Sequence, residues 1–209
     1  MKIHSLPTPL KEVVNVIIHP IRFWDDIQPT KMIRSVLLSL ILASTIGGLA
    51  SYLVQIIAMS NLDAEQFQRF HELELKSGLP ISVLTGVGVV LLYVKFFGGI
   101  LMQTIAIRLS LRIFKQKTTW SKCFAIVSFS AIPVLLFAPV ADLLLPILLG
   151  FLSLWMPGLQ IIGVHTLESV KQDKAMWIVL LSPLLLLCLV IIPLSIIILL
   201  IAFIGPLMK

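Results

Sequence analysis

Long apolar runs separated by short polar segments are the main pattern of this chain. Ser35–Leu62 carries no charged residue in 28 positions, and a second apolar run extends from about Ile81 to Ile107. From Cys123 to Leu167 the only formal charge is Asp142, and no charge occurs from Ala175 to Met208. A helix needs about 20 apolar residues to cross a bilayer, and these runs are continuous rather than alternating as in a membrane barrel. Because backbone groups in lipid must bond within their own segment, the pattern predicts an all-α integral membrane protein.

The run from Cys123 to Leu167 is too long for one crossing. Prolines divide it, and a proline within a span removes one hydrogen bond and kinks the helix; they are Pro133, Pro139, Pro146 and Pro157. We expect a helical hairpin whose tight outer turn falls at Pro139. The five expected spans of the resulting bundle are about 35–60, 81–107, 122–138, 140–165 and 175–206.

Residues 8–19 show an amphipathic pattern ahead of the first span. Thr8 suits an N-cap and Pro9 suits the first helical position. Apolar residues follow at spacings of three and four, at Leu10, Val13, Val14, Ile17 and Ile18. Lys11 and Glu12 fall on the opposite face. We predict an interfacial helix lying on the membrane, with a helix packed on the protein's own cytoplasmic loops as the alternative.

Aromatic and small residues suggest further details of the architecture. Phe23 and Trp24, just before the first span, are expected to lie at headgroup level as anchors. Gly47 and Gly48, midway along that span, permit close contact between helices. The polar residues 63–78 predict a short helix on the outer surface, closed by Gly78 at its C-terminus.

The basic residues are distributed unevenly between the two sides of the expected bundle. Of the 16 Lys and Arg residues, twelve fall before the first span or after the second and fourth, three fall on the other side, and Lys95 lies within a span. The positive-inside rule therefore predicts a cytoplasmic N-terminal segment, 1–33, ahead of a membrane domain, 34–209, whose C-terminus is outside. Five of the basic residues follow the second span, and we expect them to form a cytoplasmic surface that contacts anionic headgroups: Arg108, Arg112, Lys115, Lys117 and Lys122.

The overall composition agrees with a membrane protein. Apolar residues make up 58% of the chain and charged residues 12%, about half the charged fraction of an ordinary soluble domain. The net charge of +6 comes from residues that flank spans, which indicates orientation and headgroup contact rather than nucleic-acid binding.

Three polar residues within the spans are candidates for an intramembrane site. Lys95 lies near the middle of the second span, where a charge costs about 2.5–3.5 kcal/mol on insertion scales. Gln103 follows two turns later, so both side chains are candidates to face the bundle interior. Asp142 is expected near the outer end of the fourth span as a helix cap, with an outer-surface pair or a proton or ion ligand as alternatives. For Lys95 the alternatives are a functional site, snorkelling, or a bond to carbonyls of a neighbouring helix.

The chain resembles the Yip1 domain family in its layout and in three segments. Five spans, a cytoplasmic N-terminus and a short external C-terminus are that family's layout. The segments that resemble it are HPIRFWDDIQP ahead of the first span, SFSAIPVLL over Ser128–Leu136, and LSLWMPGLQIIGVHTLESVKQDKA over Leu152–Ala175. The short N-terminal segment is similar to that of prokaryotic members, which implies the bacterial inner membrane. Eukaryotic relatives carry a longer N-terminal region and act with Rab-type GTPases and other family members.

Two kinds of function fit these observations. The first is a non-enzymatic membrane protein that organises the bilayer or recruits partners, as the family resemblance implies; its partners would be lipid headgroups, other membrane proteins or a second copy. The second is a transporter or channel for ions, lipids or small molecules that uses the polar residues of kinked spans. The sequence contains no HExxH, no GxSxG and no Cys/His set, so we expect no catalytic, cofactor or metal site.

Overall fold

The computed structural model describes residues 8–27, 32–60, 68, 72, 74–76, 78–144 and 146–204. Within these ranges the side chains at 8, 58–60, 81, 85, 138–149, 153 and 189–204 are not described. The described residues form helices and no strand, which confirms the all-α prediction. In chain order the helices are α1 (Thr8–Ile18), α2 (Pro20–Asp26), α3 (Met32–Ser60), α5 (Ile81–Ile113), α6 (Trp120–Leu144), α7 (Pro146–Leu167) and α8 (Gln172–Ile204).

Three helices are long and apolar enough to cross a membrane when only described residues are considered: Met32–Ile57, Ser82–Ile113 and Trp120–Phe137. The outward faces of these helices are apolar, as lipid contact requires; Leu49 in α3 is 61% exposed and Val90 in α5 is 62% exposed. α7 and α8 contain 22 and 33 residues. Five crossings and the orientation of the ends remain predictions.

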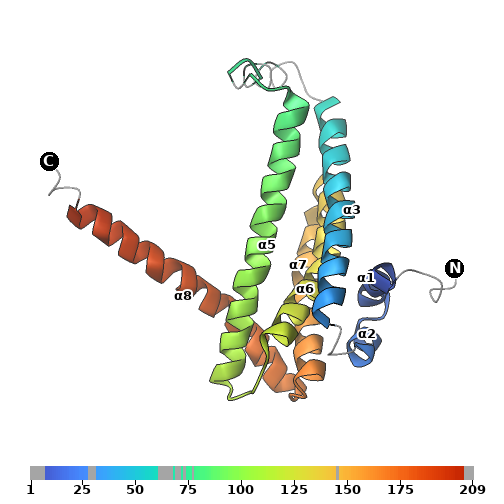
Figure 1. Ribbon diagram of the computed structural model, residues 1–209, viewed down its shortest axis with the longest axis vertical. Helices are drawn as coiled ribbons and strands as arrows, with labels where there is room; N and C mark the ends of the chain where they lie inside the picture. The colour runs from blue at the N-terminus through green and yellow to red at the C-terminus, as the bar shows by residue number, and fades with distance from the viewer. Residues whose placement is uncertain are drawn as a thin grey trace.

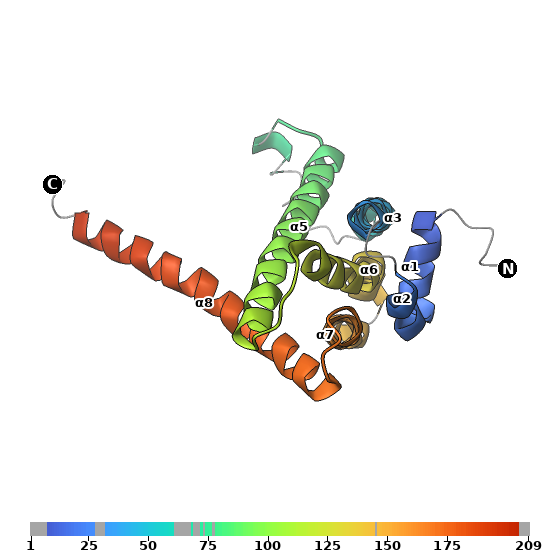
Figure 2. The same cartoon turned by 60° about the horizontal axis from the view of Figure 1, so that its bottom comes forward.

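α6 lies at the centre of the bundle, between α3, α5 and α7 (Figures 1 and 2). Its candidate span is 61% buried, compared with 28% for α3 and 12% for α5. Every residue from Ala125 to Ile132 is buried. The SFSAIP stretch is therefore the core of the molecule, around which the other helices pack.

α6 ends at Leu144 and α7 begins at Pro146, so the predicted turn at Pro139 is wrong. A proline can either lie inside a membrane helix or begin one at its first position. Here Pro139 lies inside α6, and Pro146 opens α7. Asp142 consequently belongs to the last turn of α6 rather than to the start of the next span, and its side chain lies outside the described part of the chain.

α1 packs on the transmembrane helices α3 and α6. Val13 and Val16 are buried beneath it. Glu12, expected on the polar face, instead accepts hydrogen bonds from the hydroxyls of Ser35 and Ser39 on α3, the second at 2.8 Å. α1 therefore contacts α3 itself rather than loops. The Ser35 and Ser39 hydroxyls lie one helical turn apart on α3, so both reach the Glu12 carboxylate. An interfacial position of α1 on the membrane remains a prediction.

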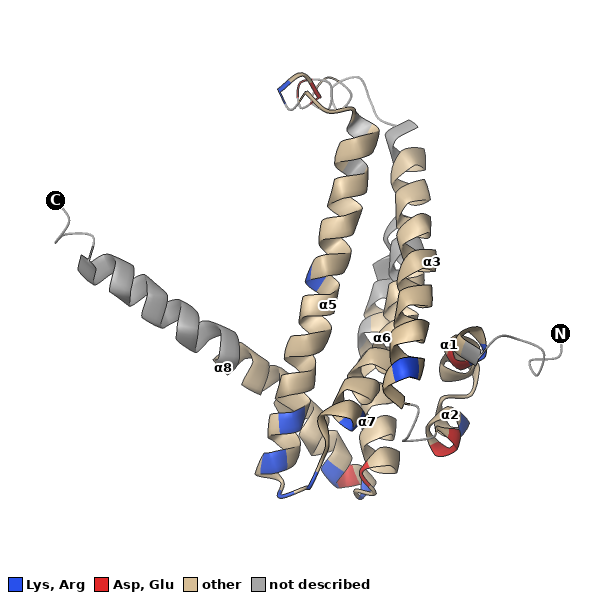
Figure 3. Ribbon diagram, viewed as in Figure 1, with Lys and Arg blue, Asp and Glu red and all other residues tan. Residues whose placement is uncertain are grey.

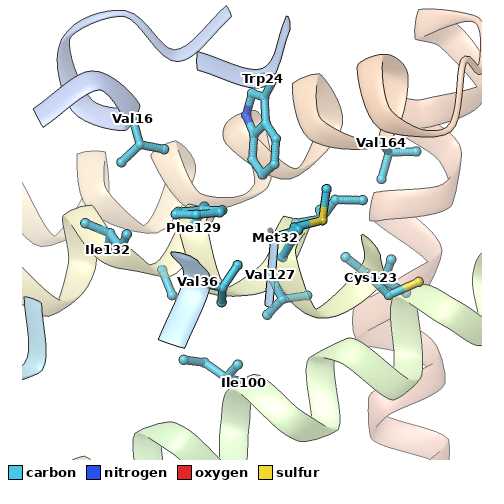
Figure 4. Packing of buried hydrophobic residues seen from close by; sticks show 14 of the residues in the cluster. Val16, Trp24, Met32, Val36, Ile100, Cys123, Val127, Phe129, Ile132 and Val164 are labelled. Carbon is cyan, nitrogen blue, oxygen red and sulfur yellow. The ribbon is translucent and has the colours of Figure 1, made fainter. Parts of the chain in front are cut away.

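Phe23 and Trp24 are buried within the protein, at 6% and 1% exposure, so the prediction of headgroup anchors is wrong. Their rings pack edge-on against Phe129 of α6, with centroid distances of 4.7 Å for Phe23 and 6.0 Å for Trp24. Figure 4 shows Trp24 and Phe129. The Trp24 ring also covers Gly163 of α7, where an added Cβ would lie 3.0 Å from it. α2 thus lies against both α6 and α7 and connects them. We call Phe23 and Trp24 the α2 wedge.

The predicted close contact at Gly47 is confirmed. A Cβ at this position would overlap the Leu135 carbonyl oxygen of α6 and the Tyr93 hydroxyl of α5. The expected role of Gly78 is also confirmed, because it has φ +67° and its N–H donates to the Glu74 carbonyl at 2.9 Å. Only residues 68, 72 and 74–76 of the segment before it are described, and they are helical.

The contact between Trp24 and Gly163 can be tested by filling the space above the glycine. Gly163→Val should destabilise the protein by about 1–3 kcal/mol, because the added methyl groups force the indole from its position. Thermal unfolding in detergent, followed by fluorescence, measures the change. Gly98→Val is the control, since a Cβ there meets no atom within 4 Å; equal midpoints for both variants would contradict the wedge.

The predicted orientation can be tested with single cysteines. In a Cys188→Ala background, Lys117→Cys should react with an impermeant maleimide only after the inner face of the membrane is made accessible. Lys76→Cys should react from the outside of intact cells. Both positions are exposed, whereas Cys123 is buried. The opposite labelling pattern would reverse the assigned orientation.

Candidate functional site at the basic end of the bundle

Basic residues gather at one end of the bundle, where α5 ends, α6 begins and α7 turns into α8 (Figure 3). We call this region the basic end. It contains the five residues expected to face headgroups, together with Lys171 and Lys174. Its shape is determined by the ends of α5 and α7 and by a cluster around the buried Glu168 carboxylate.

α5 ends in a tight cap at Lys115. The Lys115 N–H donates to the Arg112 carbonyl at 2.9 Å, and the Gln116 N–H donates to the Leu111 carbonyl at 2.9 Å. This pair of bonds is the Schellman pattern, which places the residue after the cap in the left-handed region, usually a glycine. Lys115 occupies that position with φ 57°. A lysine is therefore held in a conformation that costs it energy, which fixes the point where the basic loop leaves the helix.

α7 ends in a similar way at Ser169, which has φ 51°. The Val170 N–H donates to the His165 carbonyl at 3.2 Å. His165 Nδ1 lies 2.5 Å from the Val170 carbonyl oxygen. Because a carbonyl oxygen only accepts hydrogen bonds, Nδ1 carries the proton and donates. The turn between α7 and α8 is thereby closed on itself.

Glu168, in this turn, links the two loops of the basic end. The Thr118 hydroxyl, from the loop between α5 and α6, donates to Glu168 Oε1 at 2.7 Å. Lys122 Nζ lies 3.8 Å from the other carboxylate oxygen and donates to the Leu167 carbonyl at 2.8 Å. The Glu168 side chain is only 2% exposed. The loop before α6 and the turn after α7 are thus joined through the buried Glu168 carboxylate.

Burial raises the pKa of the Glu168 carboxyl above its ordinary value. The hydrogen bond from Thr118 and the charge of Lys122 act in the opposite direction but are smaller. A raised pKa means that the folded state favours the protonated carboxyl. The cluster is therefore a source of stability at low pH that decreases as the pH rises through the raised pKa.

The structure divides the five predicted headgroup residues into two groups. Arg112, Lys115 and Lys117 are exposed. Arg108 instead lies over the Trp120 ring at 5.5 Å, and Lys122 belongs to the Glu168 cluster. We call the three exposed residues the basic patch.

Lys95 and Gln103 do not meet within the described part of the chain, and the side chain of Asp142 lies outside it. Gln103 Nε2 donates to the Ser182 hydroxyl at 2.9 Å and so joins α5 to α8. Lys95 is exposed on the outside of α5 and makes no ion pair within the described residues. Asp142 belongs to a different helix, α6.

Glu168 and Thr118 were not singled out from the sequence. They are 50 positions apart, and a single glutamate in a loop carries no signal of burial. The predicted hairpin places the two loops on the same side, but only the fold shows that these two side chains meet.

The pH dependence of the Glu168 cluster can be measured. The unfolding midpoint of the wild type should fall as the pH rises above the ordinary carboxyl value of 4.5, because the carboxylate must ionise while buried. Glu168→Gln, which is neutral at all pH values and keeps an acceptor for Thr118, should lack this decrease. Thermal unfolding in detergent over a pH series checks the difference.

Two further variants make that result specific. Thr118→Val should destabilise the protein by about 1–3 kcal/mol, because it leaves a buried acceptor unsatisfied. Glu72→Gln, at an exposed glutamate paired with Lys76, should leave the pH profile unchanged. Parallel pH profiles for the wild type and Glu168→Gln would show that Glu168 does not titrate as its environment indicates.

Comparison with known proteins identifies a family. No curated protein matches the chain, and no solved structure matches it. The family model described as the Yip1 domain matches residues 14–193. The match includes the α2 wedge, the buried centre of α6 and the Glu168 turn. The chain belongs to the Yip1 domain family of membrane proteins.

Proposed function

We propose that this protein is a non-enzymatic membrane protein that organises the bilayer or recruits partners through its basic end. The observation that carries the proposal is the fixed position of the basic patch. Arg112, Lys115 and Lys117 are exposed side by side along one short segment, and the backbone beneath them is held by the cap at Lys115. The patch is a preformed surface for negative charge.

The surrounding structure supports that role. The Glu168 cluster ties the loop that carries the patch to the turn between α7 and α8. On the opposite side of α6, the α2 wedge fixes α7. A surface held in this way loses little conformational freedom when it binds, which favours affinity for a partner.

The expected partners are anionic headgroups and acidic protein surfaces. Each basic residue near an anionic membrane contributes about 1 kcal/mol of attraction. The positive-inside distribution favours a cytoplasmic position of the basic end.

A transporter or channel is the alternative function, and two observations favour the organising role over it. Lys95 faces outward from α5 rather than into the bundle. The buried hydroxyls of Thr104, Ser130 and Ser182 donate to carbonyls of their own helices. These three hydroxyls are engaged by local backbone groups.

Headgroup binding provides the test. Full-length protein in mixed micelles of phosphatidylglycerol and phosphatidylcholine should retain phosphatidylglycerol preferentially, as counted by native mass spectrometry. Replacing Arg112, Lys115 and Lys117 by glutamine should reduce that preference by about a hundredfold, given about 1 kcal/mol for each of the three charges. Arg69→Gln with Lys76→Gln, in the polar segment between α3 and α5, is the control and should retain the preference.

Two outcomes would contradict the proposal. An unchanged phosphatidylglycerol preference in the triple variant would remove the basic patch from lipid recognition. Ion or lipid flux into vesicles that Lys95→Leu abolishes would establish transport in place of an organising role.

A further inference from the structure

Lys95 lies on a face of α5 that no described helix covers. Residues three, four and seven positions away share this face, and they include Gly88, Leu91, Gly98 and Gly99. Leu91 is 62% exposed, and a Cβ added at any of the three glycines would meet no atom within 4 Å. We call these five residues the Lys95 face.

The depth of Lys95 makes its exposure informative. It precedes Arg108 by 13 residues, which corresponds to about 20 Å along a helix. The hydrocarbon core is about 30 Å thick, and Lys95 lies beside the midpoint of the expected span 81–107, so it lies near the middle of the core. Snorkelling serves basic residues near helix ends, whereas a charge at mid-depth normally pairs with another group. The Lys95 ammonium therefore needs an acceptor that the described part of this chain does not supply.

We propose that the Lys95 face binds a transmembrane helix of a partner protein that carries a carboxylate at mid-depth. The inference rests on the proposed recruiting role and gives it a second site, within the membrane and separate from the basic patch. Charge complementarity defines the partner, because an aspartate or glutamate on a helix is the acceptor that suits an ammonium in hydrocarbon. Gly98 and Gly99 beside Lys95 let the two backbones approach closely enough for that contact.

A second copy of this chain fits the face poorly. A symmetric contact through two α5 helices would place two Lys95 ammonium groups against each other. The one acid in the predicted spans, Asp142, lies at another depth. Trp120 is level with Arg108, whose guanidinium lies over its ring, and Asp142 follows Trp120 by 22 residues, or about 33 Å. Asp142 is therefore about 13 Å farther along the bundle than Lys95.

Designed helices of known sequence test the inference. The full-length chain, labelled with a donor fluorophore at Lys76→Cys in a Cys188→Ala background, is placed in phosphatidylcholine vesicles at pH 8. Acceptor-labelled Leu/Ala transmembrane peptides carry Glu, Leu or Lys at the centre. Energy transfer should show that the Glu-centred peptide associates at least tenfold more strongly than the Leu-centred peptide.

Charge reversal tests the pairing itself. Lys95→Leu should remove the difference between the Glu-centred and Leu-centred peptides. Lys95→Glu should transfer the preference to the Lys-centred peptide, which a merely structural role of Lys95 would not do. Gly99→Leu should weaken binding of the Glu-centred peptide by obstructing the face. Gly86→Leu, on the opposite side of α5, is the matched control and should have no effect.

Three results would each overturn the inference. The first is equal association of the Glu-centred and Leu-centred peptides with the wild type. The second is Lys95-dependent energy transfer between copies of the chain, which would make a second copy the occupant. The third is efficient bismaleimide cross-linking of Leu91→Cys to Cys188 within one chain, which would show that α8 covers the face.

The same system separates this inference from the basic-patch proposal. The triple glutamine variant of the basic patch should bind the Glu-centred peptide as the wild type does. If the protein binds the Glu-centred peptide but shows no phosphatidylglycerol preference, the Lys95 inference stands and the basic-patch proposal is rejected. If it prefers phosphatidylglycerol but does not bind the peptide, only the Lys95 inference is rejected.

Discussion

The packing of α6 against its neighbours is the constraint on which the rest of the structure depends. In a bilayer, lipid tails solvate apolar side chains as well as a protein interior does, so helices associate through close contact rather than through the hydrophobic effect. α6 achieves such contact on several sides. The Leu135 carbonyl lies against Gly47 of α3, and Phe129 lies against the aromatic wedge of α2. The wedge in turn reaches Gly163 of α7, so one helix organises α2, α3 and α7.

The basic end follows from this arrangement. Because α6 and α7 are held side by side, the loop before α6 and the turn after α7 meet, and Thr118 can reach Glu168. That buried contact leaves Arg112, Lys115 and Lys117 on the outside of the loop. α5 is much less enclosed, with only 12% of its candidate span buried. The molecule thus combines a closely packed centre with a largely uncovered flank.

Much of the architecture was predictable from the sequence, because apolar length and continuity determine where membrane helices form. The exact turn was not, since Pro139 and Pro146 are chemically equivalent and each can lie inside a helix or begin one. The burial of Trp24 was missed because aromatic residues ahead of a span usually anchor at the interface, and its partner Gly163 is far away in sequence. The outward direction of Lys95 was hidden because α5 is apolar on all sides, so its pattern does not reveal which face is inside. The Glu168 cluster needed the fold as well, for its members come from separate loops.

The wedge has a consequence for how the protein is made. α2 leaves the ribosome before any of the membrane helices, but Phe129 and Gly163, which it covers, are synthesised late in the chain. Phe23 and Trp24 therefore remain without their final partners while α3, α5 and α6 are inserted. α1 can pack on α3 once that helix is in place, but the α2 wedge can close on Gly163 only after α7 is in place. α2 is thus among the last elements to reach its native position, although it precedes the whole bundle in the chain.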